Sequence, residues 1–307
     1  MVNSPTITIA VACYNYGIYL EDCLKSIFEQ EVSANEVIVL NDGSTDDTEI
    51  IVRGLQKKYN FTYISQNNQG IVSVRNKFIT NTNTDYLIQL DADDTIPKNY
   101  VAEISKVIIS TPADIVYTPV YNLETKEIVV AGNNFNSEEL KRHNFIHASS
   151  AVSCKRLANV KYDKELDKIG LEDWDLFLNL ILTGSSAVLA EKTHLNYRIH
   201  DQIPSRSMQS RSGINQLKAM AYIYKKYSSE YVEEMGGFEW ISDNIMNALN
   251  IIGMVSEKNT HYEQLLENNR LEAEQRTNTL QNELSNIKNS KKWKIMVKVE
   301  RIIRGKR

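Results

Sequence analysis

The chain has 307 residues, of which 42% are hydrophobic and 24% are charged, and its net charge is −4. A chain of this length can bury a full hydrophobic core in one large domain or two, and its composition is that of an ordinary globular protein. The acidic balance argues against a general nucleic-acid binder, because such proteins are usually basic, so we expect no nucleic acid among the partners.

The first hundred residues alternate between strand and helix patterns. Short apolar or β-branched runs predict strands at residues 7–12, 36–40, 61–65 and 86–90. Apolar residues at helical spacing predict a helix after each of these strands. The first spans about residues 19–30, the second follows a cap at Asp46 or Asp47, the third spans residues 70–79, and the fourth runs from Pro97 to about Ser110. This alternating order predicts a mostly parallel sheet with helices on both faces.

The second part of the chain is less regular. We expect strands at residues 114–121, 127–130 and 187–199. A helix is expected to open with Gly170-Leu171-Glu172-Asp173-Trp174, and residues 211–255 carry an apolar stripe at helical spacing.

The composition changes after Glu257. Leu266, Ala273, Leu280 and Ile287 fall seven residues apart, which is typical of a coiled coil and would make residues 259–290 a contact between copies of the chain. The other seam position holds polar or charged residues, so a single solvated helix is an equal alternative.

The last twenty residues, 288–307, are strongly basic, with nine Lys or Arg against one Glu. In residues 291–307 the basic side chains fall on one side of a helix and Trp293 with several aliphatic residues on the other, the pattern of a helix lying in an anionic membrane surface. A helix packed on a partner subunit or a disordered basic end is the alternative.

The cysteine pattern and the search for targeting signals bear on the cellular compartment of the protein. We identify no secretory signal and no apolar run of about 18 residues. Cys13, Cys23 and Cys154 are far apart and odd in number, which favours reduced thiols. We therefore expect a cytoplasmic protein, which the basic tail would place at the inner face of the cell membrane.

Three carboxylates lie in Leu90-Asp91-Ala92-Asp93-Asp94, directly after the apolar run at residues 86–88. Clustered carboxylates repel one another, and a divalent cation removes that cost. Mg²⁺ and Mn²⁺ prefer such oxygen ligands and keep positions open for substrate phosphates. The cluster therefore predicts a metal–diphosphate site at the carboxyl end of a strand, where open α/β sheets bind ligands.

Four further segments accompany the acidic cluster in a fixed order. They are Ala12-Cys13-Tyr14-Asn15-Tyr16, Asn41-Asp42-Gly43-Ser44-Thr45-Asp46, Gly70 with Val74-Arg75-Asn76, and Glu172-Asp173-Trp174. Over about residues 5–205 this arrangement resembles glycosyltransferase family 2, inverting enzymes that use nucleotide-diphosphate sugars and include builders of bacterial cell-surface or protein-linked glycans. The second segment departs from the family pattern, because Asn41 stands where an Asp is commoner.

The resemblance implies the GT-A fold, an α/β architecture with a mostly parallel central sheet flanked by helices, followed here by a C-terminal helical extension. It divides the chain into a nucleotide-sugar-binding half at 1–105 and an acceptor-binding half at 106–210. A helical extension at 211–258 and a long helix or weak coiled coil at 259–307 would follow.

The donor site implied by the resemblance is formed from strand ends. Tyr14 would stack on the base and Asp42 would accept a hydrogen bond from a ring N–H, with Ala12, Asn15 and Ala92 beside them; taken alone, residues 41–44 are also a plain turn. Arg75 would reach the diphosphate or the base, the alternative being a surface helix arginine.

The resemblance also implies metal and leaving-group residues. Asp93 would be the direct ligand of Mn²⁺ or Mg²⁺, with Asp91 at the ribose or at the water shell of the metal. Asp94 is ambiguous and could cap the Pro97 helix. In Tyr197-Arg198-Ile199-His200, His200 would be a third ligand or a phosphate partner and Arg198 would hold the leaving group, although a structural histidine is as common.

Inversion requires a base that removes the proton of the acceptor hydroxyl. The Glu172-Asp173 pair matches the family segment that carries this base, and we assign it to Asp173, with Glu172 as second choice. Acids also favour the first turn of any helix. Trp174 would line an acceptor pocket or belong to the core.

The sequence thus predicts a metal-dependent inverting glycosyltransferase of polysaccharide biosynthesis. It would move a sugar from a UDP- or dTDP-sugar to a hydroxyl of a glycan, lipid-linked or protein-linked acceptor. The alternatives are a sugar-phosphate nucleotidyltransferase and a non-catalytic, membrane-tethered scaffold with a decayed transferase domain. The nucleotidyltransferase is disfavoured because the loop after the first strand, residues 13–17, lacks a basic residue.

Overall fold

The structure is a computed structural model of the chain. It describes residues 4–200 and 213–234 and individual helical positions between 264 and 285. The chain divides into two compact units, residues 1–237 and 238–307. The predicted tail helix at 291–307 lies outside the described residues, as does most of the predicted coiled coil at 259–290. The finer domain boundaries stay predictions.

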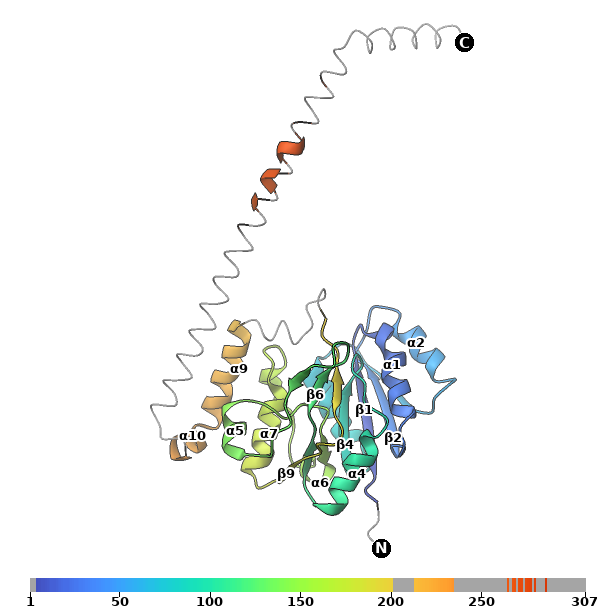
Figure 1. Cartoon of the computed structure of the whole chain (residues 1–307), viewed down its shortest axis with the longest axis vertical. Helices are drawn as coiled ribbons and strands as arrows, with labels where there is room; N and C mark the ends of the chain where they lie inside the picture. The colour runs from blue at the N-terminus through green and yellow to red at the C-terminus, as the bar shows by residue number, and fades with distance from the viewer. Residues whose placement is uncertain are drawn as a thin grey trace. The chain divides into compact units, whose positions relative to one another are not determined.

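A sheet flanked by helices forms the centre of the first unit (Figure 1). It has seven strands in the order β3-β2-β1-β4-β8-β5-β9. Neighbours among β3, β2, β1 and β4 pair in parallel, whereas β8 is antiparallel to both β4 and β5. The predicted mostly parallel sheet is therefore confirmed. The strands are β1 Ile7–Cys13, β2 Glu36–Asn41, β3 Thr62–Ser65, β4 Tyr86–Asp91, β5 Ile115–Tyr117, β8 Ala151–Ser153 and β9 Ala187–Leu189.

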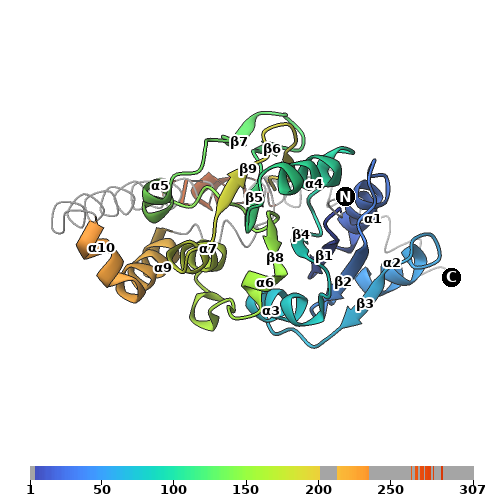
Figure 2. The same ribbon diagram turned by 90° about the horizontal axis from the view of Figure 1, so that it is seen from below.

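Helices cover both faces of this sheet, and Figure 2 shows β1, β4 and β8 between α4 on one side and α3 and α6 on the other. The described helices are α1 Gly17–Phe28, α2 Thr48–Leu55, α3 Ile71–Asn81, α4 Tyr100–Ser110, α5 Ser137–Arg142, α6 Cys154–Leu157, η1 Lys164–Leu166, α7 Glu172–Leu182, α9 Gly213–Lys226 and α10 Ser228–Glu234.

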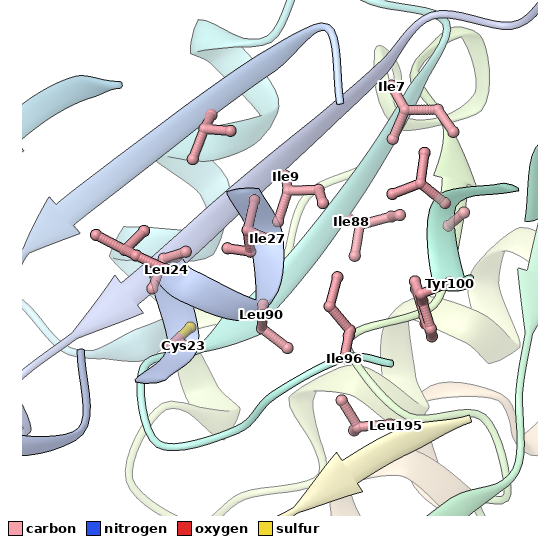
Figure 3. Close-up of a cluster of buried hydrophobic side chains, with 14 of the residues drawn as sticks. Ile7, Ile9, Cys23, Leu24, Ile27, Ile88, Leu90, Ile96, Tyr100 and Leu195 are labelled. Atoms are coloured by element: carbon pink, nitrogen blue, oxygen red, sulfur yellow. The ribbon is translucent and has the colours of Figure 1, made fainter. Parts of the chain in front are cut away.

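Alternation along β1 creates one hydrophobic cluster on each face. Ile7, Ile9 and Val11 pack with residues of α1, α2 and α4, and Figure 3 shows part of this cluster. Ala10 points to the other face and belongs to the cluster that contains Phe78 of α3 and residues of α7 and α9. The two clusters fix β1 and β4 from both sides, and hence the positions of their carboxyl ends.

Two strands predicted as continuous are each divided in two. Residues 114–121 form β5 and, after a break at Thr118-Pro119, β6 (Val120–Asn122); residues 187–199 form β9 and β10 (Leu195–Tyr197). Pro119 has no N–H for a ladder, and its carbonyl accepts a hydrogen bond from the Leu195 N–H at 2.9 Å. Within the described residues, β10, β6 and β7 (Ile128–Val130) form a second sheet of three strands.

Some element boundaries differ from the prediction. Helix α1 begins at Gly17, two residues before the expected start. Pro97 precedes α4 in a turn, with the Tyr100 N–H donating to its carbonyl at 2.9 Å, and the helix itself begins at Tyr100. Strand β8 and helix α5 were not predicted.

The predicted helix at 211–255 is confirmed over its described part as α9 and α10. Ala219 and Ile223 of α9 are fully buried against the same cluster as Trp174 of α7. The described part of this extension thus belongs to the core of the first unit.

The three cysteines lie within residues 4–200 and form no disulfide there. Burial raises the pKa of Cys13 and of Cys154 to about 11, and it raises the pKa of the fully buried Cys23 well above its usual value. Along the described helices, no stretch has the length and apolar content needed to cross a bilayer.

Candidate functional site

The predicted donor segments meet at one edge of the sheet. In the parallel register Ala12 lies beside Asp91 and Cys13 lies beside Asn41, so β1, β2 and β4 end together. The Ala92 N–H donates to the Ala12 carbonyl at 3.0 Å, which brings the acidic turn against the end of β1. Ala12 and Ala92 thus join the two loops through their backbones.

The loops after β1 and β2 brace one another. Asn15 has the left-handed backbone angle φ of 57°, and its Oδ1 accepts a hydrogen bond from the Thr45 N–H at 2.7 Å. Its own N–H donates to the Ser44 Oγ at 2.9 Å. Tyr14 is 45% exposed next to this braced pair. Its ring is therefore accessible for stacking.

Asp42 is 4% exposed and holds the loop before α3. Its Oδ1 accepts hydrogen bonds from the Gln66 side chain at 2.7 Å and the Gln69 N–H at 2.9 Å, and its Oδ2 accepts from the Gly70 N–H at 2.9 Å. A carboxylate has about four lone-pair sites, so these three bonds leave one for a ligand.

Gly70 joins this loop to the second half of the domain. Its φ is 84°, and a Cβ there would clash with the Asp167 carboxylate. The Asp167 Oδ1 accepts from the Val72 N–H at 3.0 Å at the start of α3. The glycine is thus favoured by its backbone angle, and any larger residue would also have to displace the Asp167 side chain.

The acidic residues after β4 differ in exposure. The Asp91 side chain is 41% exposed, that of Asp93 12%, and the whole of Asp94 only 2%. Asp94 accepts a hydrogen bond from the Arg198 N–H at 2.9 Å and does not cap α4, whose N-cap is Asn99. Burial, followed by the charges of Asp93 and Asp91, raises the pKa of Asp94. The buried carboxyl connects the turn to the segment after β10.

His200 and Asp93 contact one another although 107 residues separate them, with 2.8 Å between the His200 Nε2 and the Asp93 Oδ2. The imidazole is stacked on the Tyr16 ring with 5.4 Å between centroids. Within the described residues no group of three or more His, Cys, Asp or Glu is arranged to hold a metal ion. The donor chemistry, carboxylates with an imidazole at a sheet edge, nevertheless suits Mn²⁺ or Mg²⁺.

Arg198 supports the acidic turn. Its Nε donates to the Asp93 carbonyl at 3.0 Å, and its guanidinium lies 4.6 Å from the centroid of the Tyr19 ring. Its two Nη atoms lie 3.3 Å from Glu124 and 3.8 Å from Asp22. In this arrangement the side chain holds the protein's own backbone and carboxylates.

Arg75 is buried, which rules out a surface helix arginine. Its Nη1 lies 2.9 Å from the Glu172 Oε1, its Nη2 lies 3.7 Å from the Asp91 Oδ1, and its guanidinium lies 5.6 Å from the Tyr162 ring centroid. Burial by itself would lower the pKa of Arg75, but the Glu172 and Asp91 carboxylates raise it above its ordinary value.

Asp173 follows Glu172 in the first turn of α7 and is half-buried. Its Oδ1 accepts a hydrogen bond from the Trp174 N–H at 2.8 Å. Burial and then the Glu172 charge raise the pKa of Asp173 to about 6, whereas Arg75 acts in the opposite direction. Trp174 is 2% exposed and its Nε1 donates to the Leu140 carbonyl, so it belongs to the core.

Several residues near the site were given no role by sequence reasoning, although Tyr16 and Gly70 belong to the segments quoted above. Tyr16 and Tyr19 pack around His200, Gln69 and Gly70 donate to Asp42, and Asp167 contacts the start of α3. The three tyrosines at 14, 16 and 19 were the available signal, because aromatic residues clustered at a strand end suggest a ligand site.

Comparison with known proteins agrees with the resemblance to glycosyltransferase family 2. The family model described as Glycosyl transferase family 2 matches residues 8–167, more than half of the chain. Glycosyltransferase GlyA of Streptococcus pneumoniae is 29% identical over 227 residues, which are 67% of this chain and 32% of that protein. The chain thus spans about a third of the length of that curated relative.

Solved structures with a similar fold include complexes of TarS and of PcManGT. The complex of Staphylococcus aureus TarS (residues 1–349) with UDP-GlcNAc is similar with a TM-score of 0.61 and 18% identity, over 71% of this chain and 65% of that one. The mannosyltransferase PcManGT of Pyrobaculum calidifontis, in complex with GDP-Man and Mn²⁺, is similar with a TM-score of 0.54 and 14% identity, over 82% and 81%.

Proposed function

Because the chain belongs to glycosyltransferase family 2 and is a glycosyltransferase with the GT-A fold, we propose that it transfers a sugar with inversion from a nucleotide-diphosphate donor to a hydroxyl group of a glycan, lipid-linked or protein-linked acceptor. We name the sheet edge where β1, β2 and β4 end the donor edge. The observation that supports the proposal most is the contact of Arg75 with both Asp91, at the donor edge, and Glu172, beside Asp173. Donor residues and base are thereby adjacent.

The donor proposed is a UDP- or dTDP-sugar. Tyr14 would stack on the base, and the remaining lone pair of Asp42 would accept a hydrogen bond from a ring N–H of uracil or thymine. The UDP-GlcNAc bound by TarS and the GDP-Man bound by PcManGT support the nucleotide-sugar class.

Asp93, Asp91 and His200 are the residues proposed to hold Mn²⁺ or Mg²⁺. The Mn²⁺ of the PcManGT complex and the carboxylate and imidazole donors support a divalent ion. When bound, such an ion supplies positive charge that stabilises a departing diphosphate.

Asp173 is proposed to remove the proton of the acceptor hydroxyl. The acceptor oxygen then forms a bond to the anomeric carbon while the bond from that carbon to the diphosphate oxygen breaks, and the electron pair leaves with the nucleotide diphosphate. A pKa of about 6 leaves Asp173 mostly ionised at neutral pH and strong enough as a base to accept the proton.

The base assignment is tested by Asp173→Asn. We expect kcat to fall by about 10²- to 10⁴-fold, the usual contribution of a positioned base. Donor affinity, measured by calorimetry with UDP and Mn²⁺, should stay near that of the parent chain. A variant that transfers sugar at the normal rate would disprove the assignment.

The donor class is tested by a thermal-shift panel of UDP-, dTDP- and GDP-sugars with and without Mn²⁺. A UDP- or dTDP-sugar should raise the Tm, and more so with Mn²⁺, because a ligand that binds only the native state stabilises it. Asp93→Ala should remove the additional effect of the metal. Failure of every nucleotide sugar to raise the Tm would contradict the proposal.

A further inference from the structure

The pair between Arg75 and Glu172 joins two distant parts of the chain. Arg75 belongs to α3, Glu172 is the first residue of α7, and 97 residues separate them. The exposed fractions are 7% for the Arg75 side chain and 14% for that of Glu172. The pair is thus largely removed from solvent, unlike the ion pair of Arg53 and Glu49, whose side chains are 64% and 48% exposed.

Burial makes the pairing obligatory for Arg75. A guanidinium keeps its charge at any ordinary pH, so a buried one requires carboxylate partners. Its fork supplies one nitrogen to Glu172 and a second toward Asp91, which a point charge such as Lys could not reproduce. The guanidinium therefore fixes the start of α7 relative to the end of β4.

The two acids of α7 differ in what they contact. The Glu172 Oε1 is engaged by Arg75 at 2.9 Å. Asp173 accepts a hydrogen bond from the Trp174 N–H and has no ion pair with any cation of the described residues. A base must be able to accept a proton, and a carboxylate bound to a buried guanidinium is a poor acceptor.

We propose that Glu172 is a positioning residue rather than the base: its carboxylate holds Arg75, and the Arg75 guanidinium joins Asp91 at the donor edge to the helix that carries Asp173. This inference rests on the proposed function, in which Asp173 is the base. The pair sets the position of Asp173 and the charge around it.

Two opposite charges then act on Asp173. The negative charge of Glu172 raises the pKa of Asp173, and the positive charge of Arg75 lowers it. Asp91, which lies 3.7 Å from Arg75, and the Tyr162 phenol are further titratable groups beside this pair. The phenol is neutral at the pH of interest because burial raises its pKa. Removing Glu172 or Arg75 should therefore move the titration of Asp173 in opposite directions.

The first experiment measures that titration directly in the full-length protein, without donor or added metal. Protein labelled with ¹³C at the aspartate carboxyl groups is titrated by NMR, and the Asp173 signal is identified by its absence in Asp173→Asn. Relative to the parent chain, the midpoint should fall in Glu172→Gln and rise in Arg75→Gln, each by on the order of one pH unit. Unchanged midpoints in both variants would overturn the inference.

The second experiment is a double-mutant cycle on kcat, using a nucleotide sugar that raises the Tm in the panel above. Each single variant should lose about 10- to 100-fold, the cost of a misplaced catalytic group. The double variant should lose no more than Arg75→Gln alone, because both substitutions remove one interaction. Losses that multiply, with Glu172→Gln as inactive as Asp173→Asn, would return the role of base to Glu172.

The matched control is Arg156→Gln. Arg156 of α6 pairs with Asp114 at 3.0 Å, at the start of β5 and so at the opposite edge of the sheet. This variant should leave the Asp173 midpoint and kcat unchanged. Failure of the proposed function would show separately, as the failure of every nucleotide sugar to raise the Tm. Failure of the base assignment would show as an Asp173→Asn variant with normal turnover.

Discussion

At the scale of single residues, His147 is a partly buried histidine whose Nε2 lies 3.0 Å from the Thr118 Oγ1. Its buried Nδ1 makes no hydrogen bond within the described residues. Burial lowers the pKa of His147 to about 4, whereas an unfolded chain has a histidine pKa of about 6.5. Folding therefore favours the neutral ring.

Acid should therefore destabilise the native state through His147. Well above pH ~6.5 the ring is neutral in both states and the contribution of His147 to stability is complete. As pH falls toward 4, the unfolded chain binds the proton first, so the free energy of unfolding should fall by up to about 1.4 kcal/mol per pH unit from this group. Urea unfolding at a series of pH values measures it.

The variant for this test is His147→Gln, which should lower the slope of stability against pH between about 6.5 and 4. His143→Gln is the control, because the His143 side chain is 59% exposed. Equal slopes in the parent chain and in His147→Gln would show that this ring is not responsible.

The residues of the candidate site were predictable from strand ends, but their partners were not. Tyr14, Asp42 and Asp93 could be placed at one edge because the carboxyl ends of parallel strands meet there. The contacts of Arg75 with Glu172 and of His200 with Asp93 join residues 97 and 107 positions apart. Such contacts depend on how β10 and α7 pack, which spacing within one segment does not contain.

At the scale of elements, α9 is fastened to α7 by a cluster of polar side chains. The Lys226 Nζ lies 2.8 Å from both the Asp163 Oδ2 and the Asp175 Oδ2, and the Tyr227 hydroxyl donates to Asp175 at 3.0 Å. The Asp175 side chain is only 2% exposed, so it depends on these partners.

Removing the cation should therefore destabilise the fold. Lys226→Met should lower the free energy of unfolding by about 2 kcal/mol, less than for a fully buried pair because the Lys226 side chain is 29% exposed. Chemical denaturation measures the change, with the exposed neighbour Lys225→Met as control. Adding Asp175→Asn to Lys226→Met should recover part of the loss. Equal stabilities of the two lysine variants would mean that the cluster contributes little.

The elements that the sequence predicted well are those with a strong local pattern. Strands β1, β2 and β4 are apolar runs between turns, and their prediction is confirmed to within about one residue. The division of residues 114–121 at Pro119 was not predicted, because the segments on both sides of this proline are mostly apolar and read as one run. The three residues of β8 carry too little pattern to distinguish a strand.

At the scale of the whole molecule, the family match ends at residue 167, before Glu172 and Asp173. The donor edge is thus the part of the chain with the strongest family signal, and the proposed base and the segment with His200 lie beyond it. Differences in acceptor between this chain and its relatives are expected to originate in that second half, as pocket shape there sets which hydroxyl is presented.

The basic tail gives a prediction for the intact chain. We propose that residues 291–307 attach the protein to an anionic membrane surface, since each basic residue near such a surface contributes about 1 kcal/mol. The full chain should sediment with phosphatidylglycerol vesicles, less so with phosphatidylcholine vesicles and less at high salt. A chain ending at residue 290 should stay in the supernatant. Equal sedimentation of both chains would assign the attachment elsewhere.

The protonated state of the native thiols has a practical consequence for spectroscopy. Alkylating reagents react with thiolates, and burial keeps Cys13, Cys23 and Cys154 from forming them at neutral pH. A cysteine introduced in place of Ile18, which is 71% exposed just after the Tyr14–Tyr16 loop, would outcompete all three for a maleimide dye. A fluorescent reporter can therefore be attached at position 18, beside the Tyr14–Tyr16 loop, without first replacing the three native cysteines.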